Sequence, residues 1–438
     1  MLKTLVGAFK NKDIRKKILY TLMILVIVRV GSLLPIPGVD TEYFSSLLSG
    51  INTGDLSYLS AFTGGSFERM SLFALSITPY ITSSIIMQLL TIAIPKLEEM
   101  QKEGEDGRKK IASITRYVTI GLSLIESIAM AVGFGRSGLI KDSAQLSTLH
   151  YVVCIIVVIA ALTAGSAVLM WLGERITEKG VGNGISIVLL INIISGMPSD
   201  FATLYSTFVA PKTPAKGVLA AVIILAILIV MVVLVCFLQD GERRIPVQYS
   251  QKVSGRRTVG GQSTNIPLKV NTAGVMPIIF ASLMQFPVII AQLFGKSYEW
   301  TRYLSSSYWC RVEAPKYSIG LLVYIVLLII FAYFYTSITF NPIEVADNLK
   351  KAGGVIPGIT PGKSTSEYLN KILNYIVFIG AVGLLIIALI PIMCTGFFNA
   401  SVSFGGTSII IIVGVVLETL KQIESQMCNR YYKGFLSE

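Results

Sequence analysis

The chain has few charged residues for its length. Of its 438 residues, 14% are charged and 53% are hydrophobic, and the mean hydropathy is +0.69. A soluble domain carries about 25% charged residues, so this chain has roughly half the usual supply for covering a surface in water. The composition excludes a soluble enzyme and indicates one integral membrane body rather than several soluble domains.

Histidine, paired cysteines and a phosphate-binding loop are also missing. His150 is the only histidine, and the five cysteines are scattered without a C-x-x-C pair. This excludes most imidazole-based catalysis and indicates neither a zinc site nor a disulfide framework. No Walker A sequence occurs, so any ATP that the function consumes has to be hydrolysed by a partner. We therefore expect no catalytic residue, no metal and no cofactor.

Ten apolar runs are candidates for membrane-spanning helices, because a helix needs about 20 mostly apolar residues to cross a bilayer. The fifth and the tenth are short, so their ends are set only to within several residues. A basic stretch before the first run resembles a signal peptide, but no small-residue cleavage site follows it, and we expect a retained first helix. The ten runs are Ile18–Leu34, Met70–Ile94, Tyr117–Phe134, Tyr151–Trp171, Asn183–Met197, Val218–Leu238, Ala273–Leu293, Ile319–Phe340, Ile372–Ile390 and Thr407–Leu420.

The connections between these runs differ strongly in positive charge. Of the 37 Lys and Arg residues, 26 lie in the N-terminal segment and every second connection after it, and 9 lie in the other set. The remaining two, Arg29 and Arg116, fall within or at the edge of spans. Positive loops stay in the cytoplasm, so we expect both termini and the set of 26 to be cytoplasmic.

Proline placement suggests that the chain consists of two related halves. Pro79 lies in the second span, and Pro277 and Pro287 lie in the seventh, which are the second members of two groups of five. Interrupted spans at matching positions are typical of an internal repeat, although proline is common in membrane helices generally. Because five is odd, two such halves have opposite orientations. The predicted parts are residues 1–205, residues 206–420 and a cytoplasmic tail, 421–438.

Two classes of function fit such a chain: a solute transporter with an inverted repeat, and a conduit whose large cytoplasmic loops dock a partner. A transporter is expected to place several ionisable groups near the middle of the membrane. Here the clear cases are Arg29 and Glu126, with Glu418 near the end of the last span. The other span interiors are aliphatic, which favours a hydrophobic constriction without excluding a transporter.

Short motifs lie at the expected cytoplasmic loops and their flanks. In chain order they are Arg29-Val30-Gly31, Pro35-Ile36-Pro37-Gly38, Pro79-Tyr80-Ile81, Glu103-Gly104-Glu105, Gly107-Arg108-Lys109-Lys110-Ile111, Met170-Trp171-Leu172-Gly173-Glu174, Gly182-Asn183-Gly184-Ile185-Ser186, Arg243-Arg244-Ile245, Pro267-Leu268-Lys269-Val270-Asn271, Asn341-Pro342, Ala346-Asp347-Asn348-Leu349-Lys350-Lys351 and Phe404-Gly405-Gly406-Thr407-Ser408. By the number and order of these motifs, over nearly its full length, the chain resembles the SecY family, the channel-forming subunits of the bacterial Sec protein-export translocase.

The resemblance implies an all-α membrane protein of ten helices in two inverted five-helix halves, arranged as a clamshell around an hourglass pore. Unfolded preproteins would cross through the pore, and membrane segments would leave sideways between the second, third, seventh and eighth spans. The implied partners are SecE, SecG, the SecA ATPase, the ribosome, preprotein signal sequences and membrane lipids. The implied location is the bacterial cytoplasmic membrane.

The resemblance also implies two parts of a seal. A ring of branched aliphatic side chains would hold back ions at the constriction, because it offers a hydrated ion no partner. Residues 56–69, on the outer side between the first two spans, resemble the family's plug, although an ordinary surface loop is the alternative. The implied ring is Ile77, Ile81, Ile185, Leu189, Ile279 and Ile411, and the implied plug residues are Leu59, Ala61, Phe62, Gly64, Gly65 and Ser66.

The long cytoplasmic loops 239–272 and 341–370 exceed what a helix connection needs. Their basic residues can bind RNA phosphates or an acidic protein surface, or can serve only to set the topology. The family resemblance implies docking of the ribosome and SecA. One departure is Thr360, where the family commonly has an arginine associated with SecA. The candidate docking residues are Arg243, Arg244, Arg256, Arg257, Lys350, Lys351, Thr360 and Lys363.

Two charged residues within spans need a partner or water, because each would cost about 2.5–3.5 kcal/mol at a helix centre. We expect Arg29 to bond to backbone carbonyls of neighbouring helices. Glu126, in the third span, has two interpretations that the sequence does not separate: a polar cluster at the lateral exit, or a paired structural carboxylate.

Overall fold

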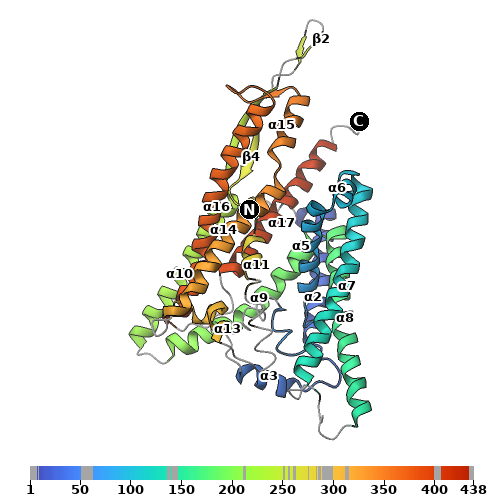
Figure 1. The fold of residues 1–438 in the computed structure, drawn as a ribbon, viewed down its shortest axis with the longest axis vertical. Helices are drawn as coiled ribbons and strands as arrows, with labels where there is room; N and C mark the ends of the chain where they lie inside the picture. The colour runs from blue at the N-terminus through green and yellow to red at the C-terminus, as the bar shows by residue number, and fades with distance from the viewer. Residues whose placement is uncertain are drawn as a thin grey trace.

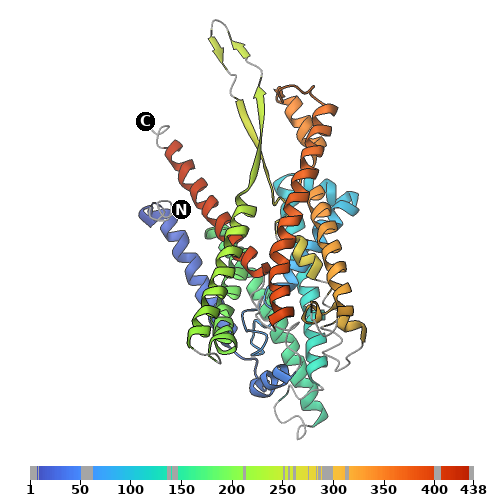
Figure 2. The same ribbon diagram turned by 90° about the vertical axis from the view of Figure 1, so that its left-hand side faces the viewer.

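The computed structural model shows a bundle of long helices from which a β-hairpin projects (Figures 1 and 2). One group of helices comes from the N-terminal part of the chain and a second group from the C-terminal part, with α9 and α17 between them (Figure 1). The structure describes residues 7, 9–50, 63–135, 140, 147–210, 214–249, 252–254, 257–259, 263–274, 276–282, 284, 288, 299–310, 315–398 and 406–433.

The first group contains α2, α5, α7 and α8, which pack against one another through apolar faces. α2 begins after Asn11, whose side-chain oxygen accepts the backbone N–H of Asp13 at 3.2 Å and so satisfies one free donor of the first turn. α5 carries Pro79 in its first turn, where a missing N–H costs nothing. The bounds are Lys12–Leu33 for α2, Thr78–Ala93 for α5, Glu105–Gly135 for α7 and Thr148–Lys179 for α8.

The second group contains α10, α11, α14 and α16 around a separate apolar core. Trp309 is fully buried there, and its indole N–H donates to the carbonyl of Tyr303 at 2.8 Å, so its one polar atom is satisfied. Leu328 and Ile278 are equally buried beside it. The bounds are Pro214–Asp240 for α10, Met276–Ser282 for α11, Ile319–Thr339 for α14 and Lys363–Phe398 for α16.

Two helices join the groups. α9 (Gly184–Leu204), which continues as the short π-helix η1 (Tyr205–Val209), packs on α8, and α17 (Gly406–Lys433) packs on α9, α10 and α16. The start of α9 lies so close to α8 that a Cβ on Gly184 would overlap the carbonyl of Gly173. The start of α2 and the end of α17 both lie toward the end of the bundle from which the hairpin projects (Figure 2).

Six helices of the described residues are long and apolar enough to cross a membrane, judged by length and composition. They correspond to the predicted third, fourth, fifth, sixth, eighth and ninth spans. A seventh is added if α5 and α6 (Pro95–Lys102), which meet at a bend of 102°, form one broken span. The fifth span is longer than predicted, since the helix runs from Gly184 to Val209.

Three predicted spans, the first, the seventh and the tenth, are not among these candidates, so the total of ten spans stays a prediction. α2 contains the first predicted span up to Leu33, with Arg29 inside the span and Lys16 and Lys17 directly before it. α17 contains the tenth together with Glu418 and Lys421. About half of the seventh lies outside the described residues, which here are 273–274, 276–282, 284 and 288.

The loop 239–272 is a β-hairpin, which corrects the prediction of an all-helical chain. Its strands β1 (Glu242–Tyr249) and β4 (Ser263–Lys269) pair antiparallel and project beyond the helices (Figure 2). The second long loop supplies β5 (Gly354–Val355), giving the strand order β4-β1-β5. A two-stranded ribbon of β2 (Lys252–Ser254) and β3 (Arg257–Val259) lies at the tip.

Alternation of side chains along β1 explains how the hairpin is held. Ile245 and Val247 are buried, and the residues between them are exposed. They pack with Leu349 of α15 and Leu369 of α16 in one apolar cluster. The two long loops therefore form one body. The remaining short elements are α3 (Thr41–Gly50), α13 (Glu299–Leu304), α15 (Pro342–Lys351), η3 (Ser306–Tyr308) and η4 (Pro315–Ser318).

Candidate functional site

A segment without regular helix joins the outer loop to α5; we call residues 64–77 the turn segment. Its backbone is bonded to the residues that follow α2: the N–H of Ile36 donates to the carbonyl of Met70 at 3.1 Å, and the N–H of Leu72 donates to the carbonyl of Leu34 at 2.9 Å. We predicted that the second span begins at residue 70, but the helix begins only at Thr78. The physical reason is that this backbone bonds to the chain after α2 instead of to its own next turn.

The turn segment contains three of the predicted plug residues, Gly64, Gly65 and Ser66. Gly64 has φ +63°, and a Cβ there would lie 2.7 Å from both the carbonyl of Asn192 and the hydroxyl of Ser195 on α9. A side chain at this position is therefore excluded by both backbone conformation and space. Gly65 also has a positive φ, and Ser66 is buried. The other three predicted plug residues, Leu59, Ala61 and Phe62, lie outside the described residues.

Four of the six predicted ring residues come together in one aliphatic cluster. Ile77 and Ile411 are buried in it, at 1% and 3% exposure, and Ile81 and Ile185 are half-buried against it. Leu189 is buried one turn beyond Ile185 on α9, so it shares that face of the helix. These residues come from the start of α5, from α9 and from α17.

Ile279 is the ring residue that the structure does not place in this cluster. It is half-buried on α11, and its neighbour Ile278 belongs to the core of the second helix group. About half of the predicted seventh span lies outside the described residues.

A polar cavity of about 580 Å³ lies at one end of the aliphatic cluster, and Ile185 and Tyr80 belong to both. Its wall carries an ion pair in which the Nε of Arg116 donates to Glu174 Oε1 at 2.7 Å. Glu418 of α17 also lines it. The cavity lies where α8 ends and α9 begins, on the predicted cytoplasmic side, so a cavity with polar walls adjoins the aliphatic cluster.

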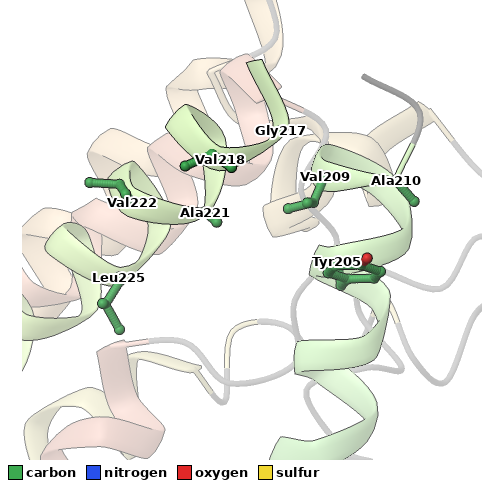
Figure 3. A pocket seen from close by; sticks show the side chains of 8 residues that line it. All are labelled: Tyr205, Val209, Ala210, Gly217, Val218, Ala221, Val222 and Leu225. Atoms are coloured by element: carbon green, nitrogen blue, oxygen red, sulfur yellow. The ribbon is translucent and has the colours of Figure 1, made fainter. Parts of the chain in front are cut away.

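A second cavity, of about 510 Å³, lies between η1 and the start of α10 (Figure 3). Apart from the hydroxyl of Tyr205 its walls are apolar side chains, including Val209, Val218 and Leu225. α10 is the most apolar of the candidate spans, and only 11% of its most apolar stretch is buried. This cavity therefore belongs to a surface suited to lipid.

The two charged residues within predicted spans have different surroundings. The guanidinium of Arg29 donates to the carbonyl of Gly64 at 3.5 Å, so it bonds to the turn segment rather than to a neighbouring helix as predicted. Glu126 is half-buried on α7, and among the described residues it has no hydrogen bond or ion pair. Beside it, the hydroxyls of Ser127 and Thr163 join α7 to α8 at 3.1 Å.

Sequence reasoning missed Asn192 and Ser195, which face the turn segment from α9. The amide nitrogen of Asn192 donates to the hydroxyl of Ser76 at 3.0 Å, and both side chains are buried. The hydroxyl of Ser195 lies 3.3 Å from the carbonyl of Gly64. A carboxamide in the middle of the apolar run Asn183–Met197 was the available signal, because such a group needs a buried partner.

The candidate docking residues lie at the end of the molecule that carries the hairpin. Arg243 is exposed on β1, and the exposed Arg244 pairs with Glu242 at 2.6 Å. Lys350 and Lys351 occupy the exposed last turn of α15, where positive charge is favourable. Arg256 and the side chain of Arg257 lie outside the described part of the chain.

Thr360 and Lys363 flank one exposed turn between β5 and α16. The carbonyl of Thr360 accepts from the hydroxyl of Thr365 at 3.0 Å, and Lys363 is the first residue of α16. Gly358 and Gly362 have positive φ in this turn. Neither the Thr360 hydroxyl nor the Lys363 ammonium is buried, so both can reach a partner. Among the described residues, no group of three or more His, Cys, Asp or Glu side chains could hold a metal ion.

The fold, a bundle of apolar helices with a polar-walled cavity beside an aliphatic cluster, is similar to that of solved channels for polypeptides. A protein-conducting channel matches with a TM-score of 0.58 at 18% identity, covering 94% of this chain and 92% of that chain. A SecY channel whose plug stabilises the closed state matches with 0.60 at 17% identity and the same coverage. Sec61 of the canine ribosome-channel complex matches with 0.57 at 16% identity, again with this coverage.

The chain belongs to the SecY family. The sequence model of that family matches residues 71–420. Protein translocase subunit SecY of Streptomyces galbus is 44% identical over 100% of both chains, and that of Halalkalibacterium halodurans is 42% identical over 100% of both. The subunit of Staphylococcus aureus is 40% identical over 99% of both. The chain is thus a protein-conducting channel, and the transporter alternative is not favoured.

Proposed function

We propose that preproteins enter this channel through the polar cavity, pass the aliphatic cluster and cross the cytoplasmic membrane through a central pore. The observation that carries this proposal is that Ile185 lines the cavity and also packs against the aliphatic cluster that contains the buried Ile77 and Ile411. An unfolded chain that enters the cavity meets the constriction directly.

The constriction would seal the resting channel by excluding water. Ile77 and Ile411 offer no hydrogen-bond partner to an ion, which would have to lose its hydration shell to pass. Branched aliphatic side chains can also separate around a polypeptide and close again without breaking polar bonds. We assign Ile81, Ile185, Leu189 and Ile279 to the same seal, the last from the family resemblance alone.

The turn segment would be the base of a plug that fills the outer side of the pore. Its support is the close approach of Gly64 to α9 and the burial of Ser66. A SecY structure that matches this fold is described as having a plug that stabilises the closed state and maintains a membrane seal. We propose the same role for residues 56–69 here.

Membrane segments would leave the pore sideways between the two helix groups, each part of one five-helix half. α5 and α14 face each other at this seam, where the hydroxyl of Tyr335 donates to Gln88 Oε1 at 3.5 Å. A long, exposed side-chain bond of this kind contributes little stability, so opening the seam here costs little. The halves would be residues 1–205 and 206–420, with ten spans in total.

The hairpin and α15 would dock the partners that supply energy, with both termini on the same cytoplasmic side. One similar fold is that of a channel in a ribosome complex. Exposed arginines and lysines on one body, Arg243, Arg244, Lys350 and Lys351, are suited to RNA phosphates and to an acidic motor surface. We propose the ribosome and SecA as these partners, with ATP hydrolysis confined to SecA, and SecE and SecG as membrane subunits.

The test is transport of a preprotein into liposomes that contain the purified chain with SecE and SecG. Added SecA and ATP should make a radiolabelled preprotein resistant to external protease, and detergent should abolish that resistance. Liposomes without this chain are the control. If the preprotein remains fully digested while a coupled solute accumulates, the chain is a transporter and the proposal is wrong.

A further inference from the structure

The turn segment is bonded to α9 through one buried pair of side chains. The amide of Asn192 donates to the hydroxyl of Ser76 at 3.0 Å, and the two side chains are 2% and 1% exposed. They are 116 residues apart in the chain. Ile77, next to Ser76, and Ile193, next to Asn192, both belong to the aliphatic cluster, so the bond lies in apolar surroundings where a hydrogen bond is strong.

Ser76 adopts a backbone conformation that it would not choose alone. Its φ is +53°, in the left-handed region that disfavours residues with a Cβ. Met70, earlier in the turn segment, has φ +41°. Strained residues persist only where surrounding contacts hold them, so the bond from Asn192 is one of the contacts on which this conformation depends.

The other end of the turn segment meets the same helix. The carbonyl of Gly64 accepts from the guanidinium of Arg29 at 3.5 Å and lies 3.3 Å from the hydroxyl of Ser195. That hydroxyl also lies 2.9 Å from the carbonyl of Asn192, so its single proton is shared between the two acceptors. The weaker contacts at Gly64 leave the Asn192–Ser76 bond as the stronger polar attachment to α9.

Few polar bonds hold the turn segment in its closed position. Within it, the hydroxyls of Ser66 and Ser71 are buried without a hydrogen-bond partner among the described residues, as is the amide oxygen of Asn192 on α9. The balance between closed and displaced therefore depends strongly on each bond that is made.

We propose that Asn192 is a positioning residue that holds the turn segment closed through Ser76 and so sets how readily a translocating chain displaces the plug. This inference rests on the proposed plug role of the segment. Loss of either partner removes this bond, which favours displacement. Removal of both partners removes only that same bond, so the double variant should differ less from the parent than the two single effects combined.

The experiment measures the resting conductance of the full complex in planar bilayers for Asn192→Leu, Ser76→Ala and the double variant. Each single variant should raise the open fraction about five- to tenfold, and the double variant should raise it no further. Both single variants should also transport a preprotein with a defective signal sequence. Once a trapped preprotein holds the channel open, their conductance should equal that of the parent. Ser199→Ala is the matched control, because this α9 serine is exposed and bonds only within its helix.

Parental resting conductance in the single variants, or additive effects in the double variant, would overturn the proposal. If Asn192→Leu does not fold, Ser76→Ala decides alone, since it removes the hydroxyl and leaves the cost of the positive φ in place. A parental conductance of Ser76→Ala would then refute the role of this bond. A parent complex that closes at rest but transports no preprotein would instead refute the proposed function, and the two failures are distinct.

Discussion

Hydrating the aliphatic cluster should make the resting channel conduct ions, and the structure gives the size of this effect. We consider Ile411→Ser combined with Ile81→Ser. Ile411 is 3% exposed, so the substitution removes nearly the full burial of an isoleucine side chain, about 2 kcal/mol. Ile81 is half-buried and contributes about half as much, about 1 kcal/mol.

Together these losses lower the free-energy difference between the dry and the hydrated constriction by about 3 kcal/mol. Since about 1.4 kcal/mol corresponds to a factor of ten, the hydrated fraction should rise about a hundredfold. The serine hydroxyls add to this effect, because they need a partner that only water supplies in an aliphatic cluster. The assay is single-channel and macroscopic current in planar bilayers without any substrate.

Ile410 provides a matched control on the same helix. It is fully buried, like Ile411, but belongs to the core of the second helix group. Ile410→Ser should lower the melting temperature at least as much as Ile411→Ser and should leave the resting current at the parental value. An unchanged current in a folded Ile81→Ser, Ile411→Ser variant would remove these two residues from the seal.

Two further predictions concern topology and the motor. Reporter fusions after Glu438 and within residues 239–272 should be cytoplasmic, whereas fusions within residues 294–316 should be outside. An outside signal at the C-terminus would mean an odd number of spans and would exclude two halves of five. Lys363→Ala should slow ATP-driven export in proteoliposomes, because its exposed ammonium replaces the charge that Thr360 lacks, and Thr360→Arg should restore the rate in that background through charge-assisted hydrogen bonds. Export at the parental rate by Lys363→Ala with its own SecA would contradict compensation by that lysine.

The sequence alone was sufficient for the membrane class and for most of the long helices. Hydropathy is a property of contiguous residues, so the runs that became α7, α8, α10, α14 and α16 were recognisable without any tertiary contact. Prediction from contiguous residues fails where the backbone forms hydrogen bonds to another part of the chain instead of within its own helix. The start of the second span is such a case, because Met70 and Leu72 pair with residues that follow α2.

The two long loops, 239–272 and 341–370, show a second limit of prediction from local sequence. Their positive charge was evident, but the strands were not predicted, because β1 is stabilised by a partner about 20 residues away and by apolar residues of α15 and α16. Alternation at Ile245 and Val247 is too short to stand out from the sequence. The finding that both loops form one basic body followed only from their packing.

The sequence by itself determined what depends on composition: a membrane protein, the apolar spans, the basic face and, through its motifs, the SecY resemblance. Tertiary structure alone decided which distant side chains meet inside the bundle. Ile77 and Ile411, 334 positions apart, belong to one aliphatic cluster, and Asn192 donates to Ser76 across 116 positions. The physical reason is that hydropathy acts locally along the chain, whereas a buried hydrogen bond or a packed aliphatic contact depends on the relative placement of whole helices.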